Sequence, residues 1–467
     1  MRLLSVHAVL AVSIPFLGFA PGPLAVPEDT RSVHDSIASK LVDIGLREGE
    51  AYSMLQELTS TAGHRLSGSH GAAVAVELTK QMMISRGFDN VHLEHVMVPH
   101  WVRGPVEEAE ILASRGRTAV PLSVCALGGS IATPEEGVTA EVIEVKSFEE
   151  LQRLGRAAEG KVVFFNRPMD PGKLNTFESY GGAVDQRSRG AIEAAKVGGV
   201  AAIVRSMTLT LDDVPHTGQM NYADTVRKIP AAAVSTLGAQ KLSKILSREK
   251  NVRVRLKLTC ETLPDVPSAN VVGEITGSEK PNEIIVVGGH LDSWDKGTGA
   301  HDDGAGCVQA IEVLSLIKKS GLRPRRTIRA VMFMNEENGL RGARAYPHAA
   351  ERAGETHIAA IESDRGGFAP HGVSVHADSL VLEKVRRWIS LFHKLGAGQI
   401  ERGPSGADIS QLVQRGVPGF ALIVDTQRYF DYHHSDHDTI DKVHPRELEM
   451  GAIVEAFLCY LISEEGL

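Results

Sequence analysis

The chain has 467 residues, of which 43% are hydrophobic and 23% charged, and its formal net charge is −8. This length allows two or three domains or one large domain with an insertion, and the composition is that of a globular protein with a full core. The acidic balance and the lack of a long basic run argue against nucleic acid as the main partner. The four cysteines stand far apart and form no CxxC pair, so we expect buried thiols rather than a disulfide framework.

The first 25 residues predict a secretory signal peptide. Arg2 is followed by an apolar run to about Ala20, and the sequence then turns to proline and glycine. An uncleaved anchor is the alternative, although the run is short for a membrane span. We therefore expect an exported protein, secreted or periplasmic and of bacterial type, with no stable membrane insertion after signal removal.

The next segment, residues 26–116, is expected to open the main domain. Residues 32–58 have a helical pattern, and residues 61–69 form a loop. A second helix over residues 70–87 ends at Gly87, a typical C-cap residue. Residues 91–99 then alternate between apolar and polar side chains, as a strand does.

Residues 117–258 have a different pattern, and we interpret them as an inserted α/β domain. Strand-like runs lie at residues 136–147, 160–168, 199–207 and 228–236, and helical stretches lie between and after them. Side chains that could bind a metal are almost never clustered here. The insertion is therefore expected to hold no metal.

Residues 259–467 are expected to complete the main domain. Strands are predicted at residues 283–290, 327–337, 357–364, 372–378 and 419–426, alternating with helices, and a helix over residues 445–463 closes the chain. This alternation predicts a mostly parallel twisted sheet covered by helices. In such sheets, functional residues gather at the carboxyl ends of the strands.

Metal-binding residue types follow four of these strands. A single carboxylate at a strand end is usually a helix cap or a surface charge, but four strand ends in succession are hard to explain in that way. Zinc binds imidazole nitrogens and carboxylate oxygens, and two zinc ions about 3.5–4 Å apart need a bridging carboxylate. The residues concerned are His290, Asp292, Asp302, Glu336, Glu337, Asp364, His433 and His434.

The motif set GHLDSWD…GAHDDGAG…NEE…ESD…YHHSDHDT resembles the co-catalytic dizinc exopeptidase family, which includes bacterial leucyl aminopeptidases and glutamate carboxypeptidase II. The further motifs RLSGS, HLEHVMVPHWVRG and PHTG are similar to the carboxypeptidase Q group of that family. The similarity extends over nearly the whole mature chain, and the insertion resembles a protease-associated domain. The resemblance implies the dizinc exopeptidase fold and a homodimer.

The resemblance also implies a role for each residue of the set. Asp302 would bridge two Zn²⁺ ions, and the Asp302–Asp303 peptide bond would be cis. Glu336 would be the general base, and Asp292 would orient the ring of His290. The remaining metal ligands would be His290, Glu337, Asp364 and His434. His433 and Ser405 are candidate substrate contacts.

Departures from the family pattern concern substrate preference rather than the metal ligands. Asp431 stands where an aromatic residue is expected, Asn335 precedes the glutamate pair, and Arg365 follows Asp364. The function predicted from these residues is hydrolysis of dipeptides or other short peptides with a free N-terminus. A glutaminyl cyclase with one zinc ion and a binding protein that has lost catalysis are the alternatives.

Overall fold

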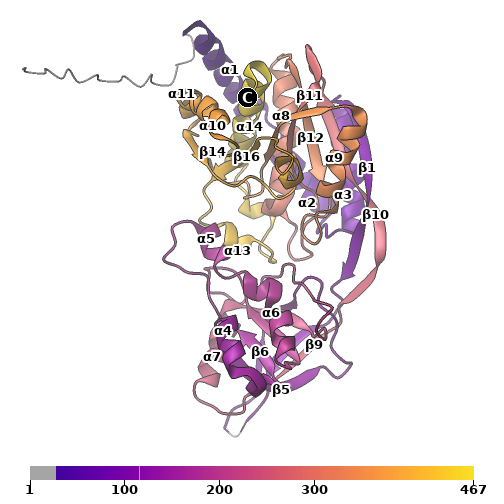
Figure 1. The fold of residues 1–467 in the computed structure, drawn as a ribbon, viewed down its shortest axis with the longest axis vertical. Helices are drawn as coiled ribbons and strands as arrows, with labels where there is room; N and C mark the ends of the chain where they lie inside the picture. Colours follow the sequence, from indigo (N-terminus) through magenta and orange to yellow (C-terminus); the bar gives the residue numbers. More distant parts are fainter. Residues whose placement is uncertain (1–27, 115) are drawn as a thin grey trace, which may run out of the picture.

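The computed structural model describes residues 28–114 and 116–467, so the predicted signal peptide lies outside the described part. Its strands form two eight-stranded sheets. The two sheets lie in two bodies stacked along the long axis of the molecule (Figure 1). We call the body with both described ends the main unit (residues 28–102 and 261–467) and the other the inserted unit (residues 107–258).

The sheet of the main unit has a parallel centre and antiparallel flanks. The order is β1 (Asp89–Val102), β10 (Glu261–Ile275), β12 (Arg326–Phe333), β11 (Lys280–His290), β13 (Thr356–Glu362), β16 (Gly419–Val424), β14 (Pro370–His376) and β15 (Gln399–Arg402). Neighbours within β12–β11–β13–β16 run parallel, whereas β1, β10 and β12 pair antiparallel, as do β14 and β16. The predicted parallel sheet is thus found at the centre, where both faces are covered.

Helices cover this sheet on both faces. The helices α8 (Ala305–Lys319) and α14 (Pro445–Glu465) pack against each other and against β11 and β12, and α1 (Glu28–Glu48) and α2 (Ala51–Thr61) pack over them. Every residue of α8 from Ala305 to Ile317 is buried, which explains its nearly continuous apolar sequence. Next to β1 and β10 lie α3 (His70–Ser85) and α9 (Arg341–Ala353), and the shorter helices are α10 (Ser379–Arg386), α11 (Ile389–Phe392), α12 (Ser410–Val413) and α13 (Tyr429–Tyr432).

The helix expected over residues 32–58 is divided into α1 and α2. A side chain at Gly49 would collide with the carboxyl group of Glu449. The same carboxyl group accepts a hydrogen bond of 3.2 Å from the main-chain N–H of Ala51, the first residue of α2. The chain therefore breaks its helix where α14 supplies an acceptor.

The inserted unit has its own sheet. The order is β3 (Val120–Leu122), β2 (Glu107–Ile111), β9 (Arg253–Leu258), β5 (Val138–Val145), β6 (Val162–Phe165), β7 (Ala201–Arg205), β8 (Ala231–Val234) and β4 (Val124–Ala126). Its helices are α4 (Phe148–Leu154), α5 (Thr176–Gly181), α6 (Asp185–Lys196) and α7 (Thr236–Leu246). This sheet begins with β2 at Glu107, whereas the sequence places the start of the insertion at residue 117.

The two units are joined in two ways. The antiparallel ribbon of β1 and β10 runs down one side of the molecule and leads into the inserted unit (Figure 1). On the other side α5 lies beside α13, where the rings of Phe177 and Tyr429 stack with centroids 5.3 Å apart. The inserted unit therefore touches the main unit close to the segment that carries His433 and His434.

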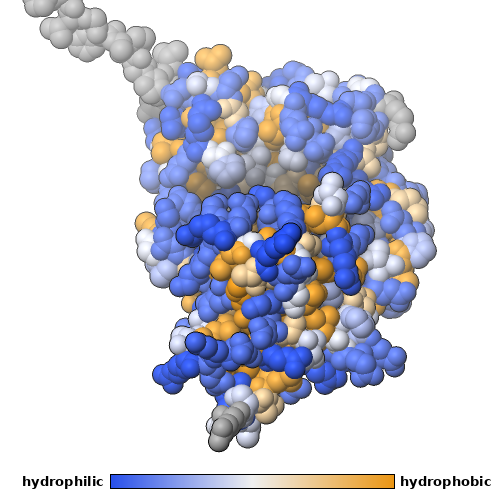
Figure 2. Space-filling view, turned by 60° about the horizontal axis from the view of Figure 1, so that its bottom comes forward, coloured by the Kyte–Doolittle hydropathy of each residue, from blue (hydrophilic) through white to orange (hydrophobic). Residues whose placement is uncertain are grey.

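The surface and the thiols agree with the composition. Hydrophilic residues cover most of the face shown in Figure 2, with hydrophobic residues between them. All four cysteines are buried free thiols, as expected. No helix within the described residues combines the length and the hydropathy needed to cross a bilayer.

Candidate metal centre

Eight of the nine predicted site residues, all except Ser405, lie at the carboxyl ends of the central parallel strands or in the loops that follow, and Asp292 comes two residues after the end of β11. His290 ends β11, and Asp302 lies in the turn between β11 and α8. Glu336 and Glu337 follow β12, and Asp364 follows β13. His433 and His434 follow β16 and the short helix α13. Because these strands are parallel neighbours, their carboxyl ends meet at one edge of the sheet.

Asp302 lies at the centre of this group. Its Oδ1 is 3.3 Å from Nε2 of His290, and its Oδ2 is 3.2 Å from Nε2 of His434. Nε2 of His290 is also 3.6 Å from Oδ1 of Asp364, and Nε2 of His434 is 3.1 Å from Oε2 of Glu337. Each oxygen of Asp302 thus faces a different histidine, and each histidine has a second carboxylate.

The chemistry of these donors fits divalent cations. Potential ligand atoms gather in two groups, one of His290, Asp302 and Asp364 and one of Asp302, His433 and His434, and Asp302 belongs to both. Two further oxygens here are buried without a hydrogen-bond partner, Oδ1 of Asp364 and Oε1 of Glu337. Buried carboxylate oxygens without partners are costly unless a cation binds them.

The pKa shifts of these groups reflect the same crowding of buried carboxylates. Burial alone would lower the pKa of His434, but the nearby carboxylates of Glu337 and Asp302 raise it to about 9. Burial and neighbouring carboxylates raise the pKa of Glu336 well above its usual value, although His290 opposes the shift. Burial likewise raises the pKa of Asp438 to about 7. The site therefore holds more buried negative charge than its own cations neutralise.

Asp292 acts on the backbone more than on the imidazole. The sequence predicts that its carboxylate orients the ring of His290, but the acceptor for Nδ1 of His290 is the main-chain oxygen of Asp292, at 2.9 Å, while the carboxylate is 3.9 Å away. The carboxylate accepts instead the N–H groups of Asn335, Glu336 and Glu337, at 2.7, 3.0 and 3.3 Å. It thereby fixes the loop that presents both glutamates.

Further buried carboxylates hold the turn that contains Asp302. Oδ2 of Asp303 accepts the N–H of His290 at 3.0 Å. Asp438 accepts the N–H groups of His301 and Asp302, at 2.7 and 3.1 Å. The Asp302–Asp303 peptide bond is cis, as the family resemblance implies. The sequence marks Asp303 and Asp438 only through their motifs, because both act on main-chain groups that become neighbours after folding.

Two residues of the RLSGS motif, Arg65 and Ser67, form hydrogen bonds with the same loops. Arg65 is fully buried and donates to the main-chain oxygens of Leu291, Thr298 and Gly299, at 2.7, 2.6 and 2.9 Å. Ser67 accepts a hydrogen bond of 2.7 Å from the amide of Asn335, which has a positive φ of 77°. Asparagine tolerates that conformation better than most residues, which explains its place before the glutamate pair.

His433 lies at the centre, whereas Ser405 does not. The ring of His433 stacks on His434 with centroids 3.5 Å apart, and its Nε2 is 3.7 Å from Oδ2 of Asp302. Ser405 packs against Gly419, the first residue of β16. Gly419 pairs with Ala360 of β13, and Gly406, the residue after Ser405, lies against the carboxylate of Glu362 at the end of β13, so the role of Ser405 as a substrate contact stays a prediction.

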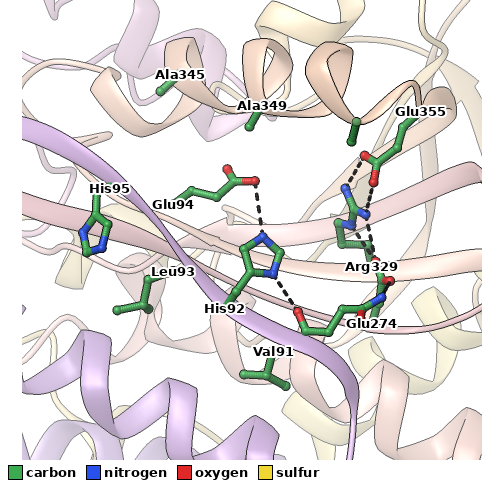
Figure 3. Close-up of a pocket in the computed structure, with 12 residues that line it drawn as sticks. Val91, His92, Leu93, Glu94, His95, Glu274, Arg329, Ala345, Ala349 and Glu355 are labelled. Atoms are coloured by element: carbon green, nitrogen blue, oxygen red, sulfur yellow. Dashed lines mark hydrogen bonds and ion pairs between the residues drawn. The ribbon is translucent and has the colours of Figure 1, made fainter.

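A cavity of about 790 Å³ lies elsewhere in the main unit (Figure 3). It is bounded by β1 and by α9, whose Ala345 and Ala349 face it. The charged groups in it pair with one another: Arg329 donates to Glu274 and to both oxygens of Glu355. This cavity lies along the strands rather than at their carboxyl ends, so its size does not make it the candidate active site.

Comparison with known proteins identifies relatives with the same organisation. The model of peptidase family M28 matches residues 270–458, which include the strand ends described above. Over 434 residues the chain is 38% identical to carboxypeptidase Q of Bos taurus, covering 92% of this chain and 89% of that protein. A peptidase M28 precursor from Shewanella amazonensis has a crystal structure similar to this one, with a TM-score of 0.89 and 35% identity over 93% of this chain and 98% of the other. A zinc aminopeptidase from Bacillus subtilis shares the fold, with a TM-score of 0.63 and 20% identity over 88% of this chain and 94% of the other.

Proposed function

The chain belongs to peptidase family M28, and on this premise we propose that it is a zinc-dependent exopeptidase that hydrolyses dipeptides or other short peptides with a free N-terminus. The observation that carries the proposal is the position of Asp302. Its two oxygens face His290 and His434 separately, at 3.3 and 3.2 Å, and each histidine is accompanied by a second carboxylate. A carboxylate so placed is suited to bridge two metal ions.

We assign two Zn²⁺ ions to the chain. His290 and Asp364 would hold one ion, His434 and Glu337 the other, and Asp302 both. His434 is preferred to His433 as the ligand, because its Nε2 is nearer to Asp302 and also reaches Glu337. Bound zinc would supply a water molecule of lowered pKa and would polarise the scissile carbonyl group.

Glu336 is the general base of this proposal. It lies beside Glu337 on the loop fixed by Asp292, and its side chain is only partly exposed. Its carboxylate accepts the proton of the attacking water and then delivers it to the leaving amine. Burial and the neighbouring carboxylates raise its pKa above the usual value for a glutamate, although His290 opposes the shift.

The remaining parts of the proposal concern the setting of the enzyme. The inserted unit is proposed to be a protease-associated-like domain that frames the substrate. His433, between Asp302 and the aromatic rings of Tyr180, Tyr429 and Phe430, is proposed to contact the substrate or the developing oxyanion. An N-terminal signal peptide and export from the cell are proposed from the sequence of the first 25 residues, and a homodimer is proposed from the family resemblance.

The polarity of the exopeptidase is tested with blocked substrates. A good dipeptide substrate is compared with its N-acetylated and its C-amidated form. We expect acetylation to abolish cleavage, because a free α-amino group would bind near the metal centre and its carboxylates. Cleavage of the acetylated peptide at the rate of the free one would contradict N-terminal recognition.

Zinc content separates the proposed function from its alternatives. Two zinc ions per chain, measured by elemental analysis of the active protein, are expected for the exopeptidase. One ion per chain would favour the glutaminyl cyclase, and none would favour a binding protein that has lost catalysis.

A further inference from the structure

The segment that carries His434 forms many of its contacts with the inserted unit. Between the end of β16 and His434, four residues of the main unit form hydrogen bonds with residues of the inserted unit. Thr176 donates to the main-chain oxygen of Thr426 at 2.9 Å, and Thr210 donates to the carboxylate of Asp431 at 2.5 Å. The remaining contacts involve Gln427, which donates to the main-chain oxygen of Leu174 at 3.0 Å, and His433.

The contacts become closest at the histidines themselves. Nδ1 of His216 is 2.7 Å from the main-chain oxygen of His433. Because a carbonyl oxygen can only accept, this nitrogen of the buried His216 carries the proton and donates it. The main-chain N–H of Thr217 donates to the oxygen of His434 at 2.9 Å. Two successive residues of the inserted unit thus bind two successive residues of the main unit.

His434 depends on such support. Its φ is +59°, in the left-handed region that a side chain with a Cβ disfavours. A residue keeps that conformation only where its surroundings impose it. Behind its ring, Nη1 of Arg187 is 3.4 Å from Nδ1, and a Cβ placed on Gly218 would come within 2.7 Å of the same nitrogen. The ring is therefore confined from the side opposite to Asp302 and Glu337.

We infer that the inserted unit is a structural part of the metal centre, because His216 and Thr217 hold the backbone that aims His434 at Asp302 and Glu337. This inference rests on the proposed function. In this arrangement His216 is a positioning residue, which acts through His434 and touches neither metal nor substrate. The ligands proposed for the other ion, His290 and Asp364, lie on β11 and after β13, and within the described residues neither is hydrogen-bonded to the inserted unit. The two metal sites should therefore respond differently when the contact is weakened.

The experiment uses the full chain and two variants of His216. His216→Phe keeps an aromatic ring but removes the donor, whereas His216→Asn retains an N–H close to the position of Nδ1. Zinc affinity of both sites is measured by competition with a chelator, together with thermal melts of the metal-free proteins. In His216→Phe one zinc should bind ~10–100-fold more weakly, the range typical for loss of a residue that orients a ligand. The other zinc should bind as in wild type, and His216→Asn should recover most of the loss.

Several outcomes would overturn the inference. Wild-type affinity at both sites in a folded His216→Phe protein would do so, and so would equal weakening of both sites, which indicates general destabilisation. Equal losses in the Phe and Asn variants would also contradict the role of the donor. A wild-type chain that binds no zinc would instead contradict the proposed function itself.

A milder variant decides the matter if His216→Phe does not fold. The double variant Thr176→Val and Thr210→Val removes two hydroxyl donors from the same contact without changing side-chain volume much. We expect it to weaken zinc binding at the same site by at least ~3-fold. The loss of two hydrogen bonds would weaken binding more than this if its whole free energy reached the metal site. Unchanged affinity at both sites in this folded protein would overturn the inference as well.

Discussion

Glu336 and Glu337 are adjacent and chemically alike, yet their surroundings give them different tasks. Oε2 of Glu337 lies 3.1 Å from Nε2 of His434, as expected for two ligands of one ion. Glu336 has its N–H bound by Asp292, and its carboxylate is close enough to Glu337, Asp364 and His290 for these charges to shift its pKa. One glutamate thus belongs to the proposed ligand set, and the other lies beside it.

Substitution should separate these two tasks. Glu336→Gln keeps the size of the side chain but cannot accept a proton, so turnover should fall by at least ~10²–10⁴-fold while both zinc ions stay bound. Glu337→Ala removes a ligand, so one zinc should bind far more weakly, and excess zinc should partly restore activity. Metal analysis and turnover of both variants check this prediction.

Two results would contradict these assignments. Loss of zinc in Glu336→Gln together with full zinc in Glu337→Ala would mean that the roles are exchanged. Full zinc and full activity in both variants would contradict the dizinc centre itself. Thermal melts with and without chelator provide a control, because loss of a bound metal removes its binding free energy from the folded state.

At the scale of single residues, the sequence predicts side chains that are candidates for binding metal or transferring protons. It misses side chains that form hydrogen bonds with main-chain groups. The proposed metal-binding residues could be found because each ends or follows a strand and the strands are parallel neighbours. The tasks of Asp303 and Arg65 could not be found, because their partners are main-chain groups brought close only by the folded loops. Asp292 shows the same limit: its residue type suggests a partner for an imidazole, whereas its carboxylate accepts three main-chain N–H groups.

Among the elements, most apolar runs were predicted, whereas β9 was missed although its charged and apolar residues alternate. The apolar runs of β11, β12 and β13 and the helices α8 and α14 agree with the structure to within a few residues. The strand β10 was not predicted, because Pro264 and Pro267 interrupt its amino half. That half pairs only with β1, where Met97 lies opposite Pro267, and such a two-stranded ribbon tolerates proline as an edge strand does.

The helix α14 contains a buried carboxyl group whose ionisation should affect stability. Glu455 has no solvent exposure, and neither of its oxygens has a hydrogen-bond partner. Burial alone raises its pKa to about 8, whereas an unfolded glutamate titrates near ~4.3. Between these two values the folded state retains a proton that the unfolded state has released. The free energy of unfolding should therefore fall as pH rises, by up to ~1.4 kcal/mol per pH unit, and level off above about pH 8.

Glu455→Gln tests this expectation, because glutamine has nearly the same shape and does not ionise. Denaturant melts from pH 5 to pH 9 should show a weaker decline in the variant, with the difference from wild type growing toward pH 8. Glu383→Gln, at an exposed position on α10, is the matched control and should leave the profile unchanged. Parallel profiles for wild type and Glu455→Gln would show that Glu455 is ionised in the folded protein at neutral pH.

For the whole molecule, the main finding is how the two units share one site. Both groups of potential ligand atoms found within the described residues belong to the main unit, and the absence of a metal from the insertion stays a prediction. Yet His216 and Thr217 bind the backbone of His433 and His434, and Thr210 binds Asp431. Asp431 was noted as a departure from the family pattern, and the structure gives it a partner in the inserted unit. No periodicity or motif could predict these contacts, because they join residues more than 200 positions apart.

This sharing makes a prediction about zinc removal, because coupling between two binding events is reciprocal. If contact with the inserted unit strengthens zinc binding at His434, bound zinc must strengthen that contact to the same degree. Chelation should therefore increase amide hydrogen exchange at Thr217 and in residues 426–434, where the two units meet. Exchange in β6 and β7, in the interior of the inserted sheet, should change little and serves as the internal control. Equal protection of Thr217 with and without zinc, in a protein shown to lose both ions, would mean that the two units stay docked regardless of the metal and that the coupling is absent.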